Sequence, residues 1–382
     1  MRYEAHMRDH WANCILHHDD DVNAFIESYF AGEDRRVLLV AAAGFDPRAN
    51  HVTQQLSATL ADRLSAVFIR EERPNPSDNL IARAEANEAV LKGLVPDSEV
   101  IQVDVFADDG APVGGHRVSS ELIKRPLDDD ITDVVLDFSA LSIGVAFPAA
   151  RLLLEACESE NNRAFHIMIS SNPELDDQIR SDPSDRPSPV KGFAPEISDE
   201  DYGDAVIWVP QLAHGRLATL TKIGTALGDF YKVCPLLPFP AKNPRRSDDL
   251  VTEFQPALVD EWNVDPRDFV HASEWNPLDC YRRLSRLKLR FDRTMEGTYV
   301  PRMVLSPIGS KVLATGALMA AIEHNMAVQY VETDSYLLAD NEEQPVSENP
   351  PDPSLVHLVL SGPLYSEFPN RNASPSSVAS SA

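Results

Sequence analysis

Hydrophobic residues in the first half of the chain form short continuous runs, and amphipathic segments separate these runs. The run VLLVAAA at residues 37–43 leads into the polar turn GFDPR, and apolar positions then recur every three or four residues over residues 49–64. Continuous apolar runs are typical of strands buried on both faces, and the recurrence is typical of helices that bury one face. The pattern predicts strand, turn and helix in this order.

The same alternation continues to residue 171. The pattern predicts further strands near residues 65–69, 99–106, 133–138 and 164–170, and helices at residues 79–94, 119–124 and 148–158. Buried strands that alternate with helices are typical of a doubly wound, mainly parallel sheet with helices on both faces.

The alternation restarts after residue 204. Strands are predicted at residues 205–211, 233–239, 269–272, 302–306 and 327–332, and helices at residues 217–230, 248–261, 277–293 and 310–325. A last apolar run, LVHLVLSG, is expected to pair at a sheet edge. Because the order of elements in the two parts is largely the same, we predict an α/β protein of two Rossmann-like halves with mainly parallel sheets, formed by internal duplication.

Three segments lack this pattern and set the expected boundaries. Residues 1–30 form a polar leader, residues 172–204 an acidic, Pro-rich linker or lid, and residues 366–382 a disordered tail rich in Ser and Asn. The two Rossmann-like halves are then expected to span residues 31–171 and 205–365.

Length and charge limit the possible partners. A chain of 382 residues exceeds what one hydrophobic core usually organises, which agrees with two halves. The formal net charge of -26, from 34 basic and 60 acidic side chains, repels a phosphate backbone over most of the surface and argues against broad nucleic-acid binding. A small anionic ligand remains possible, because one Arg, one Lys and backbone N–H groups can make a pocket locally positive.

The cysteines and the N-terminal sequence favour a cytoplasmic protein. Cys14, Cys157, Cys234 and Cys280 are far apart and show no C-x-x-C spacing, so reduced thiols are expected rather than disulfides or a zinc site. The leader lacks the apolar centre of a signal peptide, and no run approaches the roughly 20 apolar residues that span a bilayer.

Candidate ligand-binding residues follow the predicted strands, where helix N-termini of an open α/β sheet point at ligands. The first strand of each half leads into a loop with Gly and Arg, GFDPR at residues 44–48 and LAHGR at residues 212–216. In the first loop Gly44, Asp46 and Arg48 are candidates. Arg48 could hold a phosphate or carboxylate; alternatively, Asp46 caps the next helix and Arg48 pairs with an acid.

The loop SPIGSK, at residues 306–311, carries the clearest anion-binding chemistry. Ser306, Gly309, Ser310 and Lys311 combine close backbone approach, a helix cap and a mobile cation. The pattern is not a P-loop, so metal-assisted nucleotide hydrolysis is not implied. A purely structural turn and cap is the alternative.

Other candidates lie at neighbouring strand ends. Asp137 and Ser139 follow the first half's fourth strand, and Glu332 and Tyr336 follow the second half's last strand, where they could contact a ribose or a base. A helix or turn cap is the alternative for Asp137, and packing is the alternative for Tyr336. The leader also contains Cys14 and the possible metal ligands His6, His10, His17, His18 and residues 19–21. These side chains could ligate a metal only if they fold together. A solvated helix is favoured instead, so no metal is expected.

Catalysis is left open by the sequence. Standard hydrolase patterns are absent, and Asp46 and Asp137 are the candidate acid or base residues if an enzyme is present. No cofactor is indicated by any motif.

At SPIGSKVLATGALMAAIEHNMAVQYVE, residues 306–332, the chain resembles the CARF-type Rossmann sensors of prokaryotic anti-phage defence systems. In those sensors a strand, a turn with Gly and Lys, a long apolar helix and a strand form part of a nucleotide pocket. Their turn is commonly G-G-T-K-like, whereas this turn contains Ile308, Gly309, Ser310 and Lys311. The resemblance implies a homo-oligomer, such as a dimer, that binds a nucleotide signal and passes that state to a protein partner.

Three functions remain open. The first is a defence-system component that binds a nucleotide or other small phosphorylated ligand as a sensor or scaffold for a separate effector, since no effector domain is visible in the sequence. The second is an enzyme acting on a nucleotide or nucleoside. The third is an acidic interaction protein that meets a basic partner without a ligand.

Overall fold

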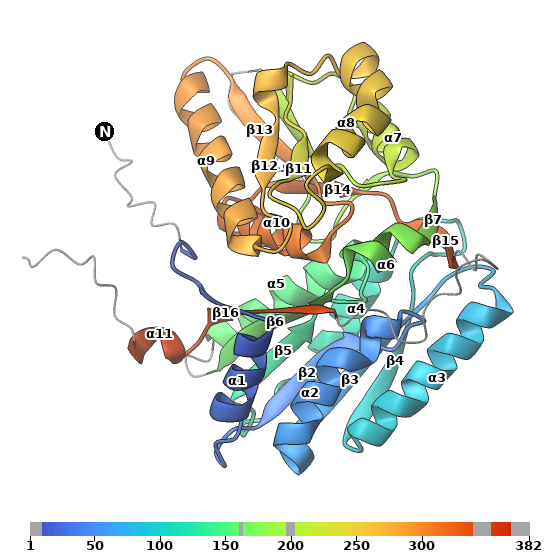
Figure 1. The fold of residues 1–382 in the computed structure, drawn as a ribbon, viewed down its shortest axis with the longest axis vertical. Coiled ribbons are helices and arrows are strands. Elements are labelled where there is room, and N and C mark those ends of the chain that lie inside the picture. The colour runs from blue at the N-terminus through green and yellow to red at the C-terminus, as the bar shows by residue number, and fades with distance from the viewer. Residues whose placement is uncertain (1–9, 160–162, 196–202, 339–352, 368–382) are drawn as a thin grey trace, which may run out of the picture.

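The computed structural model describes residues 10–159, 163–195, 203–338 and 353–367 (Figure 1). They form two α/β halves, the first in the lower part of Figure 1 and the second in the upper part. Within the described residues, no helix is both long and apolar enough to cross a membrane. The predicted α/β fold with two mainly parallel sheets is confirmed.

The first sheet has seven strands in the order β1-β16-β6-β5-β2-β3-β4. Strands β2 to β6 are parallel, β16 is antiparallel to both β6 and β1, and the bounds are β1 Ile15–His18, β2 Val37–Ala42, β3 Leu64–Glu72, β4 Ser98–Asp104, β5 Asp133–Asp137, β6 Ala164–Ser171 and β16 Ser354–Ser361. The order β4-β3-β2-β5-β6 is that of a Rossmann-like sheet. Strands β3 and β4 are added on one side of β2 and strands β5 and β6 on the other, so the strand order reverses between β2 and β5. Ligands of such sheets bind beside this reversal.

Helices cover both faces of the first sheet. One face packs against residues of α1, α2 and α3, and the other against α4 and α5, with bounds α1 Asp20–Tyr29, α2 His51–Leu60, α3 Asp78–Leu94, α4 Gly114–Ile123 and α5 Ile143–Ser159. The second face shares one continuous core with the second half, to which Ile207, Leu313 and Met303 belong. The halves are therefore joined by buried apolar contacts and not only by the chain.

The second half repeats this order with a divided second strand. Strand β9 lies between β10 and β13, β14 follows β13, and the pair β11-β12 continues the sheet through a bridge between Gln211 and Leu236. Pro235 has no N–H to give to the ladder, and it separates β10 from β11. The bounds are β9 Asp204–Pro210, β10 Lys232–Val233, β11 Leu236–Pro238, β12 Val270–Ala272, β13 Val300–Ser306, β14 Ala327–Tyr330, α7 Leu217–Leu227, α8 Arg246–Pro256, α9 Pro277–Met295 and α10 Lys311–Glu323. The repeated order agrees with internal duplication.

Several predicted boundaries need correction. Strand β16 was predicted to belong to the second half, but it pairs with β6 in the first sheet. Almost all of its residues are buried, and the first sheet provides this burial because both of its faces are covered. The leader contributes β1 and α1, since Val22 and Ile26 bury one side of α1 against the first sheet. The predicted helices at residues 119–124 and 148–158 begin earlier, at the starts of α4 and α5.

The predicted linker or lid is ordered over much of its length. It contains α6 (Pro173–Gln178), β7 (Ile179–Pro183) and β8 (Ser188–Pro189), of which β7 pairs with β15 (Thr333–Leu338) and β8 with β14. This segment therefore joins the second half by strand pairing. Residues 196–202 of the linker and 368–382 of the predicted tail lie outside the described residues, and α11 (Leu364–Glu367) precedes the latter.

A hydrogen-bonded histidine chain ties the two added edge strands to the first sheet. His17 Nδ1 lies 3.0 Å from His357 Nδ1, His357 Nε2 lies 3.0 Å from His166 Nδ1, and His166 Nε2 lies 3.0 Å from Asp133 Oδ1. The chain crosses β1, β16, β6 and β5, and Tyr29 of α1 donates to Asp133 at 2.9 Å. His17 is thus held in the sheet and not on a solvated helix.

Candidate functional site

A cavity of about 220 Å³ lies where the loops that follow the strands of the two halves meet. It is lined by the ends of β2, β3 and β5 in the first half and by the loops after β9 and β13 in the second. All four loops singled out in the sequence contribute: GFDPR, DFSALSIG, LAHGR and SPIGSK. The structure brings Gly44, Asp46, Arg48, Ser139, Gly309, Ser310 and Lys311 to this one cavity.

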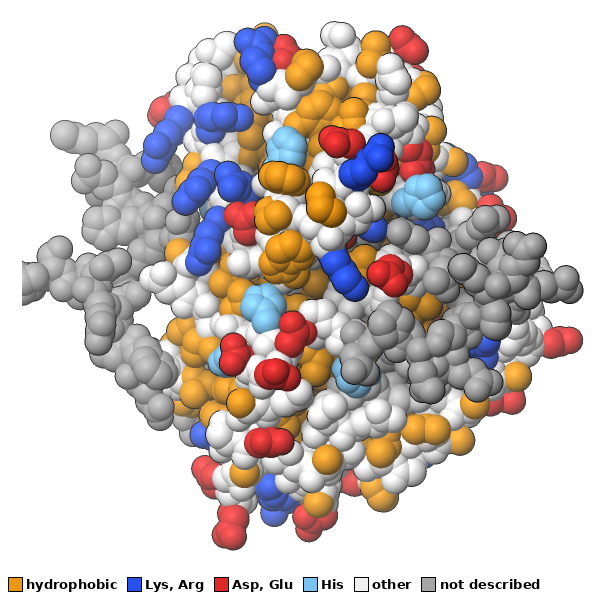
Figure 2. All heavy atoms as spheres, in the orientation of Figure 1, with side chains coloured by type: hydrophobic (Ala, Val, Ile, Leu, Met, Phe, Trp, Pro, Cys, Tyr) orange, Lys and Arg blue, Asp and Glu red, His pale blue; other side chains and the backbone are white. Residues whose placement is uncertain are grey.

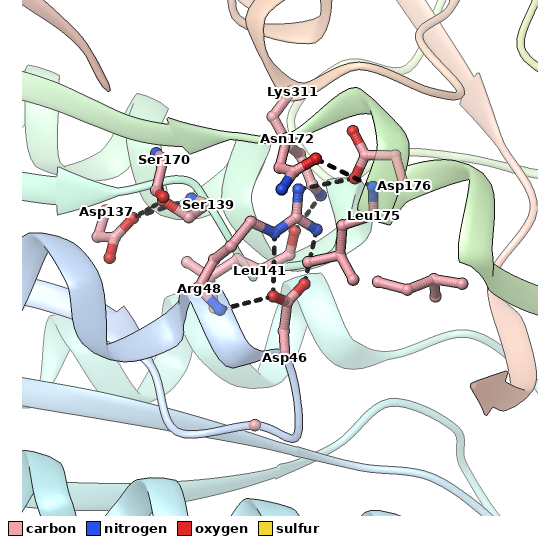
Figure 3. A network of polar contacts seen from close by, with 12 residues as sticks. Asp46, Arg48, Asp137, Ser139, Leu141, Ser170, Asn172, Leu175, Asp176 and Lys311 are labelled. Carbon is pink, nitrogen blue, oxygen red and sulfur yellow. Dashed lines mark hydrogen bonds and ion pairs between the residues drawn. The ribbon is translucent and has the colours of Figure 1, made fainter. Parts of the chain in front are cut away.

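Arg48 is held between two carboxylates (Figure 3). Asp46 caps the short 3₁₀ helix Pro47–Asn50 by accepting from Arg48 N at 2.9 Å, and its two oxygens accept from Arg48 Nε at 3.0 Å and Nη2 at 2.7 Å. Arg48 Nη1 donates to Asp176 of α6 at 2.7 Å. Burial would raise the pKa of Asp46, but the Arg48 guanidinium outweighs it and lowers that pKa. The structural alternative for this loop, a cap with an acid-paired arginine, is the arrangement present.

Lys311 differs from Arg48 because its charge has no such partner. It is the first residue of α10, and its Nζ donates to the carbonyl of Leu141 in the first half (Figure 3). Among the described residues, no carboxylate lies within ion-pair distance of this ammonium, and Phe138 presents its ring 5.2 Å away. Burial lowers the pKa of Lys311 to about 8, while Glu71 and Asp176 act in the opposite direction. The cavity therefore contains a half-buried, weakly compensated cation.

Two hydroxyl groups beside this cation have no partner. Ser310 Oγ and Ser142 Oγ, at the starts of α10 and α5, are buried without a hydrogen bond among the described residues, and both residues line the cavity. The expectation that Ser310 caps α10 is wrong, because its side chain makes no capping hydrogen bond. A buried hydroxyl without a partner costs roughly 1–3 kcal/mol, so a ligand that accepts from it is favoured.

Gly309 allows two loops of the second half, SPIGSK and LAHGR, to approach each other closely. Its φ is +143°, and a Cβ added there would lie 2.6 Å from Ala213 Cβ in the LAHGR loop. Arg216 of the same loop donates to the carbonyl of Ile179 at 3.2 Å and also lines the cavity. Only glycine combines this backbone angle with such a close approach.

An ion-pair network in the wall of the cavity connects the halves. Arg73, after β3, donates to Glu71 at 2.7 Å, to Glu332 at 3.3 Å and to the carbonyl of Thr333 at 2.6 Å. Glu332 is 4% exposed and does not line the cavity, and burial raises its pKa despite Arg73. Glu332 was expected to contact a ligand, but it forms an ion pair with Arg73 that connects the two halves. Glu71 and Arg73 were not among the predicted site residues. The charged sequence IREER, at residues 69–73 and the end of β3, was the signal that could have indicated them.

Two other predicted site residues serve the core. Ser306 Oγ accepts from Trp208 Nε1 at 2.9 Å, and Ser306 lies outside the cavity lining. Asp137 Oδ1 accepts from Ser139 N at 2.9 Å and from Ser139 Oγ at 2.5 Å. Burial raises the pKa of Asp137 to about 7, but Asp137 does not reach the cavity either. Ser139 lines it and also accepts from Ser170 N at 2.7 Å.

The cavity is more positive than the rest of the chain. Its lining has six basic side chains and five acidic ones, while the whole chain has 34 and 60. On the face in Figure 2, acidic side chains are spread over the first half, and basic ones gather at the upper left, where α9 lies in Figure 1. The basic residues of the cavity are Arg48, Arg70, Arg73, Arg216, Arg246 and Lys311.

No cluster of three or more metal-ligating side chains occurs within the parts of the chain that are described. Of the leader residues considered for a metal, His17 is bonded to His357, and Cys14 donates to the carbonyl of Val359 at 3.2 Å. His6 lies outside the described residues.

Comparisons with known proteins give no family. The chain matches no protein-family model, and a search of curated protein sequences gives no match. Similar solved structures include one described as a UDP-N-acetylglucosamine 2-epimerase from Listeria monocytogenes, with 7% identity and a TM-score of 0.24 over 75% of this chain and 90% of that chain.

Two further structures have comparable scores. A glycosyltransferase from Rickettsia africae ESF-5 has 8% identity and a TM-score of 0.19, covering 73% of this chain and 81% of its own. An N-terminal ketoreductase from a macrolactin assembly line has 7% identity and a TM-score of 0.19, covering 84% and 72%. Scores this low carry no argument about activity, and the fold assignment rests on strand order.

Proposed function

We propose that this protein binds a nucleotide or other small phosphorylated ligand between its two halves and acts as a sensor or scaffold for a partner effector of a bacterial defence system. The observation that carries the binding proposal is Lys311, a half-buried lysine at the start of α10 with no carboxylate at ion-pair distance among the described residues. The defence role and the partner come from the resemblance of residues 306–332 to CARF-type sensors.

The surroundings of Lys311 suit a phosphate group. Its Nζ and the hydroxyls of Ser310 and Ser142 supply donors, and α10 and α5 both begin at the cavity, so their dipoles favour negative charge there. At neutral pH an amine with a pKa near 8 is mostly protonated, and a bound anion would stabilise that charge.

A ligand here would touch both halves at once. Lys311 of the second half already contacts Leu141 of the first, and Arg73 of the first half contacts Glu332 of the second. Anion binding would replace or strengthen such contacts, so the stability of the packing between the two halves would depend on the ligand. This coupling is what a sensor needs.

The catalytic alternative has weaker support. Both oxygens of Asp46 are engaged by Arg48, and Asp137 lies outside the cavity lining, so neither carboxylate is placed to move a substrate proton. The ligand-free alternative, an acidic interaction protein, leaves the half-buried charge of Lys311 unexplained.

The test is ligand titration of the purified chain by calorimetry and thermal shift. We expect nucleoside phosphates or pyrophosphate to bind and to raise the melting temperature, and we expect Lys311→Met to remove both effects. Lys124→Met is the matched control, because Lys124 is an exposed lysine paired with Glu121 on α4. Absence of binding by every phosphate compound to the folded protein would refute the proposal.

A further inference from the structure

We infer that the ligand is a nucleoside phosphate whose base stacks at an aromatic subsite made by Phe45 and Tyr336, which line the same cavity as Lys311. This inference rests on the proposed function and narrows its ligand class. The observation behind it is that one cavity has a cationic part and an aromatic, apolar part contributed by different loops.

The aromatic subsite is built by segments far apart in the sequence. Phe45, in the GFDPR loop, and Tyr336, in β15, have ring centroids 5.2 Å apart at an interplanar angle of 51°, and both are half-buried in the lining. The Arg73 guanidinium lies 5.1 Å from the Tyr336 ring. Rings arranged this way offer a face on which a base can stack, with a cation that strengthens the contact.

The loop that carries Phe45 is held in place from α3. Asn87 Nδ2 donates to the carbonyls of Gly44 at 2.8 Å and Asp46 at 3.1 Å, the residues on either side of Phe45. A side chain on a fixed loop loses little freedom when a ligand stacks on it, so more of the contact energy appears as affinity.

An apolar wall continues from this loop along α3 and β3. Ile69, Leu80, Ile81 and Ala84 line the cavity, and Ala84 precedes Asn87 by about one helical turn. A phosphate or a free sugar gains nothing from such a wall, whereas a planar heterocycle buries apolar surface against it. The lining therefore fits a molecule with an aromatic end and an anionic end.

A short series of contacts links the start of α5 to the aromatic subsite. Glu71 accepts from Ser142 N at 2.7 Å and from Arg73 at 2.7 Å, and the Arg73 guanidinium lies 5.1 Å from the Tyr336 ring. The Thr333, Asp334 and Ser335 segment before Tyr336 also lines the cavity and offers polar atoms for a ribose or a base edge. Stacking accepts every base, so the geometry points to the class of ligand and not to one base.

The experiment compares ligands that share a phosphate and differ in the base. Calorimetry is run with pyrophosphate, ribose 5-phosphate and a set of nucleoside 5′-mono- and diphosphates on wild type, Phe45→Ala, Tyr336→Ala and Lys311→Met. Phe45→Leu and Tyr336→Leu keep the volume if an alanine variant does not fold. Phe239→Ala, an aromatic residue 51% exposed outside the cavity, is the matched control.

We expect nucleoside phosphates to bind wild type about tenfold or more tightly than ribose 5-phosphate, and each aromatic variant to weaken them by about tenfold while leaving pyrophosphate binding unchanged. Equal affinity for pyrophosphate, ribose 5-phosphate and nucleotides would overturn the base subsite and leave the proposed function in place. Nucleotide binding that folded aromatic variants do not weaken would overturn it as well. Binding of none of these compounds would overturn both.

Discussion

Burial of Lys311 should make the protein less stable at neutral pH than it would be without this charge. The ordinary pKa of lysine is 10.5, and burial lowers that of Lys311 to about 8. Between these values the unfolded chain binds more protons than the folded chain, so the free energy of unfolding rises with pH across this window. The lowering of this pKa corresponds to roughly 3 kcal/mol, and at pH 7 the free energy of unfolding is reduced by this full amount.

Replacing Lys311 by Met removes the charge and keeps an unbranched apolar side chain. The replacement also removes the hydrogen bond to the Leu141 carbonyl, which costs about 1 kcal/mol. We therefore expect Lys311→Met to be more stable than wild type by about 2 kcal/mol at pH 7 and less stable by about 1 kcal/mol at pH 10.5.

Urea unfolding of wild type and variant at intervals from pH 7 to 10.5 measures this crossing. Titration of other groups affects both proteins and cancels in the difference, and Lys124→Met controls for the loss of an exposed lysine. A stability difference that stays constant over this range would refute the account of Lys311 as a desolvated cation. A confirmed crossing would show that the charge of Lys311 is retained at the expense of stability.

Further predictions concern packing, pH and reactivity. Gly316→Ala should lower the free energy of unfolding by about 1–3 kcal/mol, because the added Cβ would lie 2.6 Å from Cys280 Cβ where α10 meets α9. Gly93→Ala on α3, where an added Cβ meets nothing within 4 Å, should raise it by about 0.5–1 kcal/mol. Urea unfolding of both variants tests these expectations. Burial and the neighbouring histidines hold the pKa of His357 well below 6.5, so stability should fall as pH drops below 6.5, and His357→Gln should reduce that fall in acid titrations followed by circular dichroism. Burial raises the pKa of all four cysteine thiols, so thiol reagents at pH 8 should label them only after denaturation; rapid labelling of the native protein would contradict the burial.

The sequence predicted the local elements well where burial was complete. The runs at β2, β5 and β6 and the second part of β13 are almost entirely buried and consist mainly of apolar residues, and these strands coincide closely with the expected ranges. Element ends were less predictable: α5 begins at Ile143 and contains Pro148 in its interior, whereas a proline is more often found in the first turn of a helix.

The candidate site was predictable in part. Loops after parallel strands collect at one edge of a sheet, which groups GFDPR with DFSALSIG and LAHGR with SPIGSK, and the packing of the two halves then brings Arg48 and Lys311 to one cavity. It could not be predicted that Arg48 is paired with Asp176 while Lys311 has no carboxylate partner among the described residues. Asp176 comes from the segment that was predicted to be a linker or lid.

The sequence by itself determined the alternation of strands and helices, the repeated order and the residues available at strand ends, because these depend on local burial and spacing. Only the tertiary structure decided which end residues face the cavity and which support it: Glu332 pairs with Arg73 and Ser306 with Trp208, while Lys311 is left without a carboxylate within ion-pair distance among the described residues. Charge compensation depends on contacts between residues distant in sequence, and those contacts exist only once the two halves have packed together.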